Sequence, residues 1–548
     1  MRNRSGLHRG WVLLLILFAV RSAYGCDELP AGRTLWIRLV APISSYTAKP
    51  GDPVRAVLTQ DLVCENEVVL PMGTRIEGVV RSKRKVGFGI RHETAALELA
   101  FNRAVPDAGA TLTIATRVEE VLNAREVVRK GVIEGVRSTD TFQGRINSRL
   151  IHLPTWNPYS DPVLIAFKAV FPIFPEPEIY YPAGTDLRLE TTTKTSLPPA
   201  AASYAAEPSE ETKAEKAQMD ELVEQLPLRV VTKKNLDADV LNIVFLGDEE
   251  QVRSAFRQAG WHDAAPSSRQ AAFKNFYALL NNSGYEQQPM MTFLLNGKPQ
   301  DMSLQKSLNS YDRRDHLRIW SWPQEGGAKT VWVSSSTRDT RAALNLKSRG
   351  FVHHIASDID EERSFIIRDL NFPGCVRSVS YVQRPTMPAA SRNATGDLMQ
   401  TDGSVAVVTL QDCQRGPQQN VTKADSFKAG NHIFRFVRRQ ILTFRSDIVR
   451  ANILYGAYEG GRLMVNALRH PPAANLAGRQ ATMNAGDSRV RVRSHGTARQ
   501  PQIVPTLERA ANPMGEELGG FPQASDRGSL QPLICCNSST LVTSVEFR

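Results

Sequence analysis

A run of alternating polar and apolar residues, Asp315 to Trp322 (DHLRIWSW), holds the first side chains of this chain that could do chemistry. Successive side chains of a β-strand point to opposite faces of its sheet. As a strand, this run places His316, Arg318 and Trp320 on one face, with the leucine and isoleucine between them on the other. A sheet face that carries a base, a cation and an aromatic ring is suited to bind a polar ligand.

A second polar run follows at residues 351–363 (FVHHIASDIDEER). It also alternates, so only one of His353 and His354 can share a face with His316. We expect His354 to do so, because Phe351, His353 and Ile355 form the more apolar face. The acids after it stand at a strand-to-helix turn that can bring a carboxylate back over the sheet. The predicted site therefore gathers His316, Arg318, Trp320, His353, His354, Asp358, Asp360, Glu362 and Arg363.

Histidine and carboxylate side chains are the ligands that Zn²⁺ and Mn²⁺ prefer, and a metal-bound water is a nucleophile near neutral pH. The predicted ligands of such a divalent metal are His316, His354 and Asp358. The alternative is a structural network, in which the acids stabilise a helix N-terminus and pair with Arg318 and Arg363. The chain has no H-E-x-x-H, G-x-S-x-G, P-loop or G-x-G-x-x-G motif, which argues against classical zinc protease, serine hydrolase and nucleotide-binding chemistry.

Two regions rich in predicted strands must position these residues. The second also contains helices that cover its sheet, so the predicted fold class is α+β. Residues 27–195 contain strand-like runs bounded by Gly and Pro, typical of a barrel or sandwich, and repeat a P-x-G-T turn. Residues 196–232 are Pro-, Ala- and Glu-rich and are expected to be a linker. Residues 236–460 mix strands with helices, including one after Asp248 and one whose face carries Phe273, Phe276 and Leu280. Their asparagine-glycine hairpin at 296–297 predicts a mainly antiparallel sheet.

The N-terminus has the pattern of a secretory signal peptide, residues 1–25: a basic start, the apolar run WVLLLILFAV and a small-x-small site. Ten apolar residues are too short to span a bilayer as a helix. We therefore expect export to the periplasm or cell envelope of a bacterium. In an oxidising compartment the pairs Cys26–Cys64 and Cys375–Cys413 are candidate disulfides, although buried free thiols remain the alternative.

The C-terminal part is strongly basic. Residues 430–457 predict an amphipathic helix rich in arginine, which could contact an anionic membrane surface peripherally or pack on its own domain. Residues 461–548 are Ala-, Gly-, Pro- and Ser-rich, contain no lysine, and are expected to form a disordered tail. The formal net charge of the 548-residue chain is +11, but an exported protein meets little nucleic acid. Envelope lipid or polysaccharide is the expected electrostatic partner.

Two resemblances follow from these motifs. RRDHLRIWSWP (313–323), TVWVSSSTRDT (330–340) and FVHHIASDIDEERSFIIRDL (351–370) are similar to the LssY C-terminal domain family, over residues 236–385. That family occurs near secretion genes and fused to membrane modules, and the resemblance implies an envelope setting without naming a reaction. The run GDPVRAVLTQDLVCENEVVLPMGTRIEGVV resembles the β-barrel of type IV secretion outer-ring proteins.

The favoured function is therefore binding or assembly at the envelope or in secretion, with a lipid, a polysaccharide or a secretion component as partner. The alternative is a metal-dependent hydrolase that acts on an envelope lipid or phosphoester. The sequence alone leaves open whether the protein is an enzyme, because no complete catalytic set can be assembled from it.

Overall fold

The computed structural model describes residues 28–64, 67–89, 91–107, 109–137, 176–197, 212–323, 331–345 and 350–414, with 433–434, 436–438 and 441–442. The predicted signal peptide, Cys26 and the predicted tail lie outside these residues. We call residues 28–197 the barrel domain and residues 212–414 the C-terminal domain. Both belong to one compact unit, Met1–Arg469.

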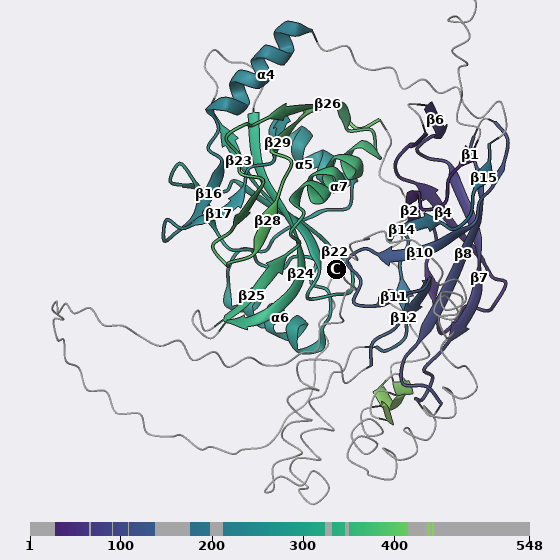
Figure 1. Cartoon of the computed structure of the whole chain (residues 1–548). Helices are drawn as coiled ribbons and strands as arrows, with labels where there is room; N and C mark the ends of the chain where they lie inside the picture. The colour runs from purple at the N-terminus through teal and green to yellow at the C-terminus, as the bar shows by residue number, and fades with distance from the viewer. Residues whose placement is uncertain are drawn as a thin grey trace, which may run out of the picture. The chain divides into compact units, whose positions relative to one another are not determined.

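The barrel domain is built on a nine-stranded, nearly closed antiparallel sheet (Figure 1). Strands such as β4 alternate between exposed and buried positions, so one face of the sheet lines a single apolar core. The strands along the sheet are β10 (Thr116–Val121), β14 (Asp186–Thr191), β2 (Thr34–Leu39), β4 (Pro53–Leu58), β7 (Arg75–Arg84), β8 (Ala96–Val105), β12 (Val132–Glu134) and β11 (Val127–Arg129), with β9 (Leu112–Thr113) on β8.

Three short strand pairs of the barrel domain lie outside this sheet. They are β1 (Glu28–Leu29) with β15 (Thr195–Ser196), β3 (Ile43–Ser44) with β13 (Tyr180–Tyr181), and β5 (Leu62–Cys64) with β6 (Glu67–Leu70). The repeated P-x-G-T sequence forms the same turn twice. Gly73 and Gly184 both have positive φ, of 92° and 87°, and the hydroxyl of the following threonine donates to the carbonyl of the proline in each turn.

The C-terminal domain contains an eight-stranded mixed sheet. Its order is β19 (His262–Asp263), β22 (Met302–Ser307), β23 (Arg314–Trp322), β24 (Val331–Asn345), β18 (Ile243–Leu246), β29 (Ser404–Leu410) and β26 (Val376–Gln383), with β25 (Gly350–Ile355) paired to β24. All described pairs are antiparallel except β18 with β29, which are parallel. This confirms the predicted α+β class with a mainly antiparallel sheet.

Two layers cover this sheet. On one face lie α5 (Glu249–Gln258) and α7 (Ile359–Asn371), which bury Phe256, Phe365 and Ile366 against Leu317 and Ile319 of β23 (Figure 1). On the other face lie α4 (Lys213–Gln225) and a four-stranded sheet of β17 (Asp237–Val240), β16 (Arg229–Thr232), β20 (Phe293–Leu295) and β21 (Lys298–Pro299). A small hairpin pairs β27 (Ala390–Arg392) with β28 (Leu398–Gln400).

The C-terminal domain begins earlier than the sequence predicted. Both α4 and β16 fall inside the stretch expected to be a linker, yet Val223, Leu226 and Val230 are buried in the core beneath the second layer. Val223 in the last turn of α4 and Leu226 at its C-cap, with the partly buried Met219 and Leu222, attach this otherwise polar helix to the sheet. Within the described residues, no helix is both long and apolar enough to cross a membrane.

Candidate functional site

Strand β23 has the alternation that its sequence indicates. Leu317 and Ile319 belong to the core beneath α5 and α7, whereas Trp320 belongs to the core on the opposite face. His316 and Arg318 share the face of Trp320, and all three are at most 4% exposed. The chain therefore buries a base and a cation on the face covered by the small sheet.

His316 meets an aspartate of the neighbouring strand and a histidine of the next one. Its Nδ1 lies 3.6 Å from Oδ2 of Asp339 on β24, and Nδ1 of His353 on β25 lies 3.5 Å from the same oxygen. Arg314 Nε donates to this Asp339 oxygen at 2.7 Å. Gln288 Nε2 lies 3.0 Å from His353 Nε2. We call Gln288, Arg314, His316, Asp339 and His353 the histidine cluster.

Burial separates the protonation states of this cluster. Burial lowers the pKa of His316 to about 3, although Asp339 opposes the shift, and burial also lowers the pKa of His353. Burial by itself would raise the pKa of Asp339, but His316 and Arg314 outweigh it and lower that pKa to about 2. At neutral pH the cluster therefore contains one carboxylate, one guanidinium and two uncharged imidazoles.

The cluster has two polar atoms with unused hydrogen-bonding capacity. Nδ1 of His316 and Nδ1 of His353 are buried and have no hydrogen-bond partner among the described residues, because both lie too far from Asp339 for a good bond. The other ring nitrogen of His316 lies 3.1 Å from the Thr337 hydroxyl. Such atoms can donate to or accept from a polar ligand group.

A second polar chain continues from the cluster along the same face. Arg318 Nη1 lies 3.3 Å from Oδ2 of Asp239, and Asn393 donates to the other oxygen of Asp239 at 3.4 Å. Asn393 also accepts from the backbone of Asp397, whose carboxylate lies 2.6 Å from His354 Nδ1. Burial raises the pKa of Asp239, against the opposing effect of Arg318. Two neighbouring carboxyl groups, of Asp239 and Asp339, thus have pKa values shifted in opposite directions, a pattern found at sites of acid–base chemistry.

The structure selects His353, not His354, as the partner of His316, which corrects our expectation. Residues 351–355 alternate, but the face of His353 is covered by Tyr311, whose ring centroid lies 5.1 Å from that of His353. The more apolar face of this strand, which carries His353, is therefore the face that meets His316, and not the face of His354. A bulge in the pairing of β24 with β25, between Asp339 and Arg341, adjusts the register next to the cluster.

The acids after β25 do not join the cluster either. Asp358 is the N-cap of α7 and accepts from the backbone of residues 360 and 361. Asp360 accepts from the Thr401 hydroxyl and the Asp402 backbone, and Arg363 pairs with Asp402 at 2.8 Å. These are the structural roles that we weighed as the alternative for Asp358, Asp360 and Arg363.

The metal set predicted from His316, His354 and Asp358 is therefore not assembled. No group of three or more His, Cys, Asp or Glu side chains within the described residues is placed to hold a metal ion. In the histidine cluster, the Asp339 oxygen that faces both imidazoles already accepts from Arg314, whose positive charge would oppose a cation there. The cluster suits an uncharged polar group better than a metal.

Asp339, Arg314 and Gln288 are the cluster members that the sequence prediction missed. Asp339 is the second-last residue of the TVWVSSSTRDT motif, and strand parity places it on the face of Thr337 and Val333. Parity gives the face of Asp339, but not its position along the neighbouring strand. That position depends on the hairpin register, in which His316 lies opposite Thr337. Gln288 lies in a loop and had no signal.

Glu362 lies on the opposite face of the sheet, away from the cluster. It is 2% exposed, beside Asp315, and its Oε2 is 3.5 Å from Nε of Arg338. Burial and then the charge of Asp315 raise the pKa of Glu362 well above its usual value. Asp315 accepts from Arg338 at 2.7 Å and from Asn123 of the barrel domain at 2.6 Å. This face of the sheet is the one that the barrel domain contacts.

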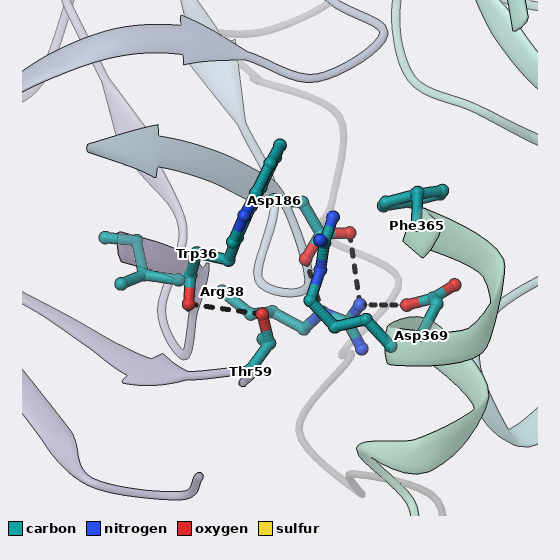
Figure 2. A pocket seen from close by; sticks show the side chains of 8 residues that line it. Trp36, Arg38, Thr59, Asp186, Phe365 and Asp369 are labelled. Atoms are coloured by element: carbon teal, nitrogen blue, oxygen red, sulfur yellow. Dashed lines mark hydrogen bonds and ion pairs between the residues drawn. The ribbon is translucent and has the colours of Figure 1, made fainter. Parts of the chain in front are cut away.

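Four charged side chains form ion pairs at that contact, which we call the junction: Arg38, Asp186, Lys306 and Asp369. Figure 2 shows three of them, Arg38, Asp186 and Asp369. Arg38 of the barrel domain donates to Asp186 at 2.7 Å and to Asp369 of α7 at 2.5 Å. Lys306 Nζ lies 3.0 Å from Asp186 and 2.9 Å from Asp369. Burial alone would raise the pKa of Asp186, but Arg38 and Lys306 outweigh it and lower that pKa to about 2. The space here that could hold a water molecule is about 0 Å³, so the junction is a packed contact and not a ligand pocket.

The helical residues between 433 and 442 bear on the predicted membrane contact of residues 430–457. Leu442 belongs to the barrel core, and Arg438, 1% exposed, pairs with Glu176 and Glu178. One face of this segment thus packs on its own chain, as the alternative held. Ile433, Phe436, Val437 and Ile441 are exposed, and the rest of the predicted helix lies outside the described residues.

The described cysteines are all oxidised. Cys375 and Cys413 are joined by a disulfide, which ties the end of α7 to the segment after β29. Cys64 is also disulfide-bonded, but Cys26 lies outside the described residues, so its pairing with Cys64 stays a prediction.

Comparison with known proteins adds the following. One similar solved structure is ComB10 of the Com type IV secretion system of Helicobacter pylori, at 14% identity and a TM-score of 0.20, covering 32% of this chain and 94% of that chain. No curated protein matches the chain. Residues 223–405, which include the histidine cluster and most of the sheet of the C-terminal domain, match the family model described as the LssY C-terminus.

Proposed function

We propose that this protein is exported and acts in the cell envelope as a binding or assembly component, and that its C-terminal domain holds a polar ligand at the histidine cluster. The observation that carries this proposal is the pair of buried nitrogens, His316 Nδ1 and His353 Nδ1, which face Asp339 without a hydrogen-bond partner among the described residues.

An unsatisfied buried polar atom costs about 1–3 kcal/mol, so a face that only had to pack would favour apolar side chains. The opposite face of β23 has that character at Leu317 and Ile319. If the Gln288 amide donates to His353 Nε2, the ring proton of His353 lies on Nδ1, while the Nδ1 of His316 can be an acceptor. A hydroxyl group both donates and accepts, so a hydroxylated envelope molecule, such as a saccharide, matches this pair.

The barrel domain is the docking module in this proposal. Ion pairs among Arg38, Asp186, Lys306 and Asp369 join it to the C-terminal domain. This contact supports a role in which the barrel domain docks on a partner and holds the ligand-binding domain beside it. A metal-dependent hydrolase, the alternative from the sequence, would need ligands that the described residues do not assemble.

The test is native mass spectrometry of the full-length protein purified from the envelope fraction, followed by identification of any molecule released on denaturation. His316→Ala and His353→Ala are the variants, and His262→Ala, exposed on β19, is the matched control. We expect a hydroxylated molecule at 1:1 on the wild type and on His262→Ala, and none on the two cluster variants. An empty wild type, or equal occupancy in all four proteins, would contradict ligand binding. A stoichiometric metal that both variants lose would instead support the hydrolase.

Export and domain organisation have their own tests. N-terminal sequencing of the envelope protein should begin at Cys26, and an intact Met1 would refute the signal peptide. Limited proteolysis should cut first within 198–211, between the two described domains. An early cut inside 240–380 would refute the domain boundary.

A further inference from the structure

Helix α6 (Arg269–Asn281) presents its aromatic residues to solvent. Phe273 is 70% exposed, Phe276 50% and Tyr277 37%. The face that packs on the domain consists instead of Ala271, Ala278, Leu279 and Asn281. The sequence predicted that Phe273 and Phe276 would face inward, so the apolar stripe of this helix is real but lies on the outside.

The charge of α6 has one sign. Arg269 and Lys274 are its charged residues, both are exposed, and the helix contains no Asp or Glu. Two phenylalanine side chains at i and i+3, with two cations beside them, are typical of a helix that lies in a membrane interface. Cations also favour an anionic surface over a neutral one.

We propose that α6 is an interfacial helix that docks the C-terminal domain on an anionic lipid surface. The aromatic rings enter the headgroup region, and Arg269 and Lys274 remain at the level of the phosphates. A protein partner would more often be matched by charges of both signs around the patch. The missing acids in α6 are therefore the reason to choose lipid.

Docking in this way brings the lipid surface next to the histidine cluster. Asn275 of α6 donates to the Tyr311 hydroxyl at 3.4 Å, and the Tyr311 ring contacts His353. The loop after α6 places the carbonyl of Gln288 at 3.3 Å from Arg314 and the carbonyl of Met291 at 3.0 Å from Arg318. The loop that follows α6 thus contains Gln288, a member of the histidine cluster, and connects the docking helix directly to it. The inference does not depend on which ligand the cluster binds, or on whether it binds one.

The experiment is co-sedimentation of the full-length protein with vesicles of phosphatidylglycerol or of phosphatidylcholine. We expect binding to phosphatidylglycerol that weakens with added salt and little binding to phosphatidylcholine. Phe273→Ser/Phe276→Ser should weaken the binding on the order of a hundredfold, because each ring that no longer enters the interface costs roughly tenfold. Lys274→Glu should weaken it several-fold. Leu236→Ser, at a site 53% exposed on the β16–β17 turn, is the control and should bind as the wild type does.

Two outcomes would overturn the proposal. One is the absence of vesicle binding in the wild type. The other is binding that survives Phe273→Ser/Phe276→Ser but is lost in Ile433→Ser/Val437→Ser, which would assign the lipid contact to the exposed residues of the C-terminal helical segment instead. Both outcomes leave the ligand test of the histidine cluster unaffected, so the two proposals fail separately.

Discussion

Replacing Arg38 by methionine tests whether the junction stabilises the protein. Arg38 bridges Asp186 and Asp369, and its side chain is 8% exposed. Methionine keeps the apolar stem but removes the guanidinium. Asp186 and Asp369 then retain Lys306, and Arg368 nearby, but both lose the guanidinium that donates to them directly.

Two estimates of the cost agree in size. Removing one partner of a buried ion pair costs about 3–5 kcal/mol. Independently, the pKa of Asp186 lies at about 2 instead of 3.8, a net difference worth about 2 kcal/mol that remains after burial has opposed the effect of Arg38 and Lys306. Because Lys306 remains, we expect Arg38→Met to lower the free energy of unfolding by about 3 kcal/mol at pH 7. A carboxylate with a lowered folded pKa stabilises above its unfolded pKa, so the difference from wild type should shrink as the pH falls from 3.8 towards 2.

Urea unfolding followed by tryptophan fluorescence measures this change. Trp261 donates to Asp369 at 2.6 Å and Trp36 lies under the Arg368 guanidinium, 3.8 Å from it, so both report on the junction. Arg55→Met, on an exposed position of β4, is the control and should change stability by less than about 0.5 kcal/mol. A loss below about 1 kcal/mol for Arg38→Met, or a loss that stays constant down to pH 2, would refute the reasoning.

Three further predictions concern single groups. Burial raises the pKa of Glu362 above its usual 4.5, so the free energy of unfolding should fall as the pH rises beyond that value. Glu362→Gln should make the free energy of unfolding, measured in urea, depend less on pH between about pH 5 and 8. An unchanged pH dependence would contradict this prediction. Burial lowers the pKa of His316 to about 3, so its ring proton NMR signals should not titrate between about pH 8 and 5. Burial also lowers the pKa of His353, so the midpoint of that ring should lie below 6.5, and a midpoint at or above 6.5 for either histidine would contradict the buried cluster. Replacing Cys375 and Cys413 by serine removes a crosslink between residues 38 positions apart, and should lower the free energy of unfolding by about 3–4 kcal/mol in the same assay. A loss under about 1 kcal/mol would contradict this estimate and show that the unfolded chain is already constrained without the disulfide.

Strand parity was the part of the site that the sequence could predict. It placed His316, Arg318 and Trp320 together because a two-residue period depends only on the strand itself. It could not identify Asp339 as the acid of the cluster, since that needs the register between β23 and β24.

The choice between His353 and His354 failed for a related reason. We took the polar face of the strand to be the functional one, but the chain places the histidine of the cluster under Tyr311. The same rule misjudged α6, where Phe273 and Phe276 point outwards. Hydrophobicity predicts burial well for a whole element, and poorly where an apolar surface or a buried polar group has its own use.

The four charges of the junction have a consequence for how the chain is assembled. Each domain contributes one cation and one anion: Arg38 and Asp186 from the barrel domain, Lys306 and Asp369 from the C-terminal domain. Arg38 can therefore pair with Asp186 inside the barrel domain before Asp369, 331 positions later in the chain, is available. Arg368 of α7 adds a further, partly buried cation from the C-terminal domain beside this cluster. Closing the contact thus brings Arg368 close to Asp186, a carboxylate of the other domain, which offsets part of the cost of burying that cation.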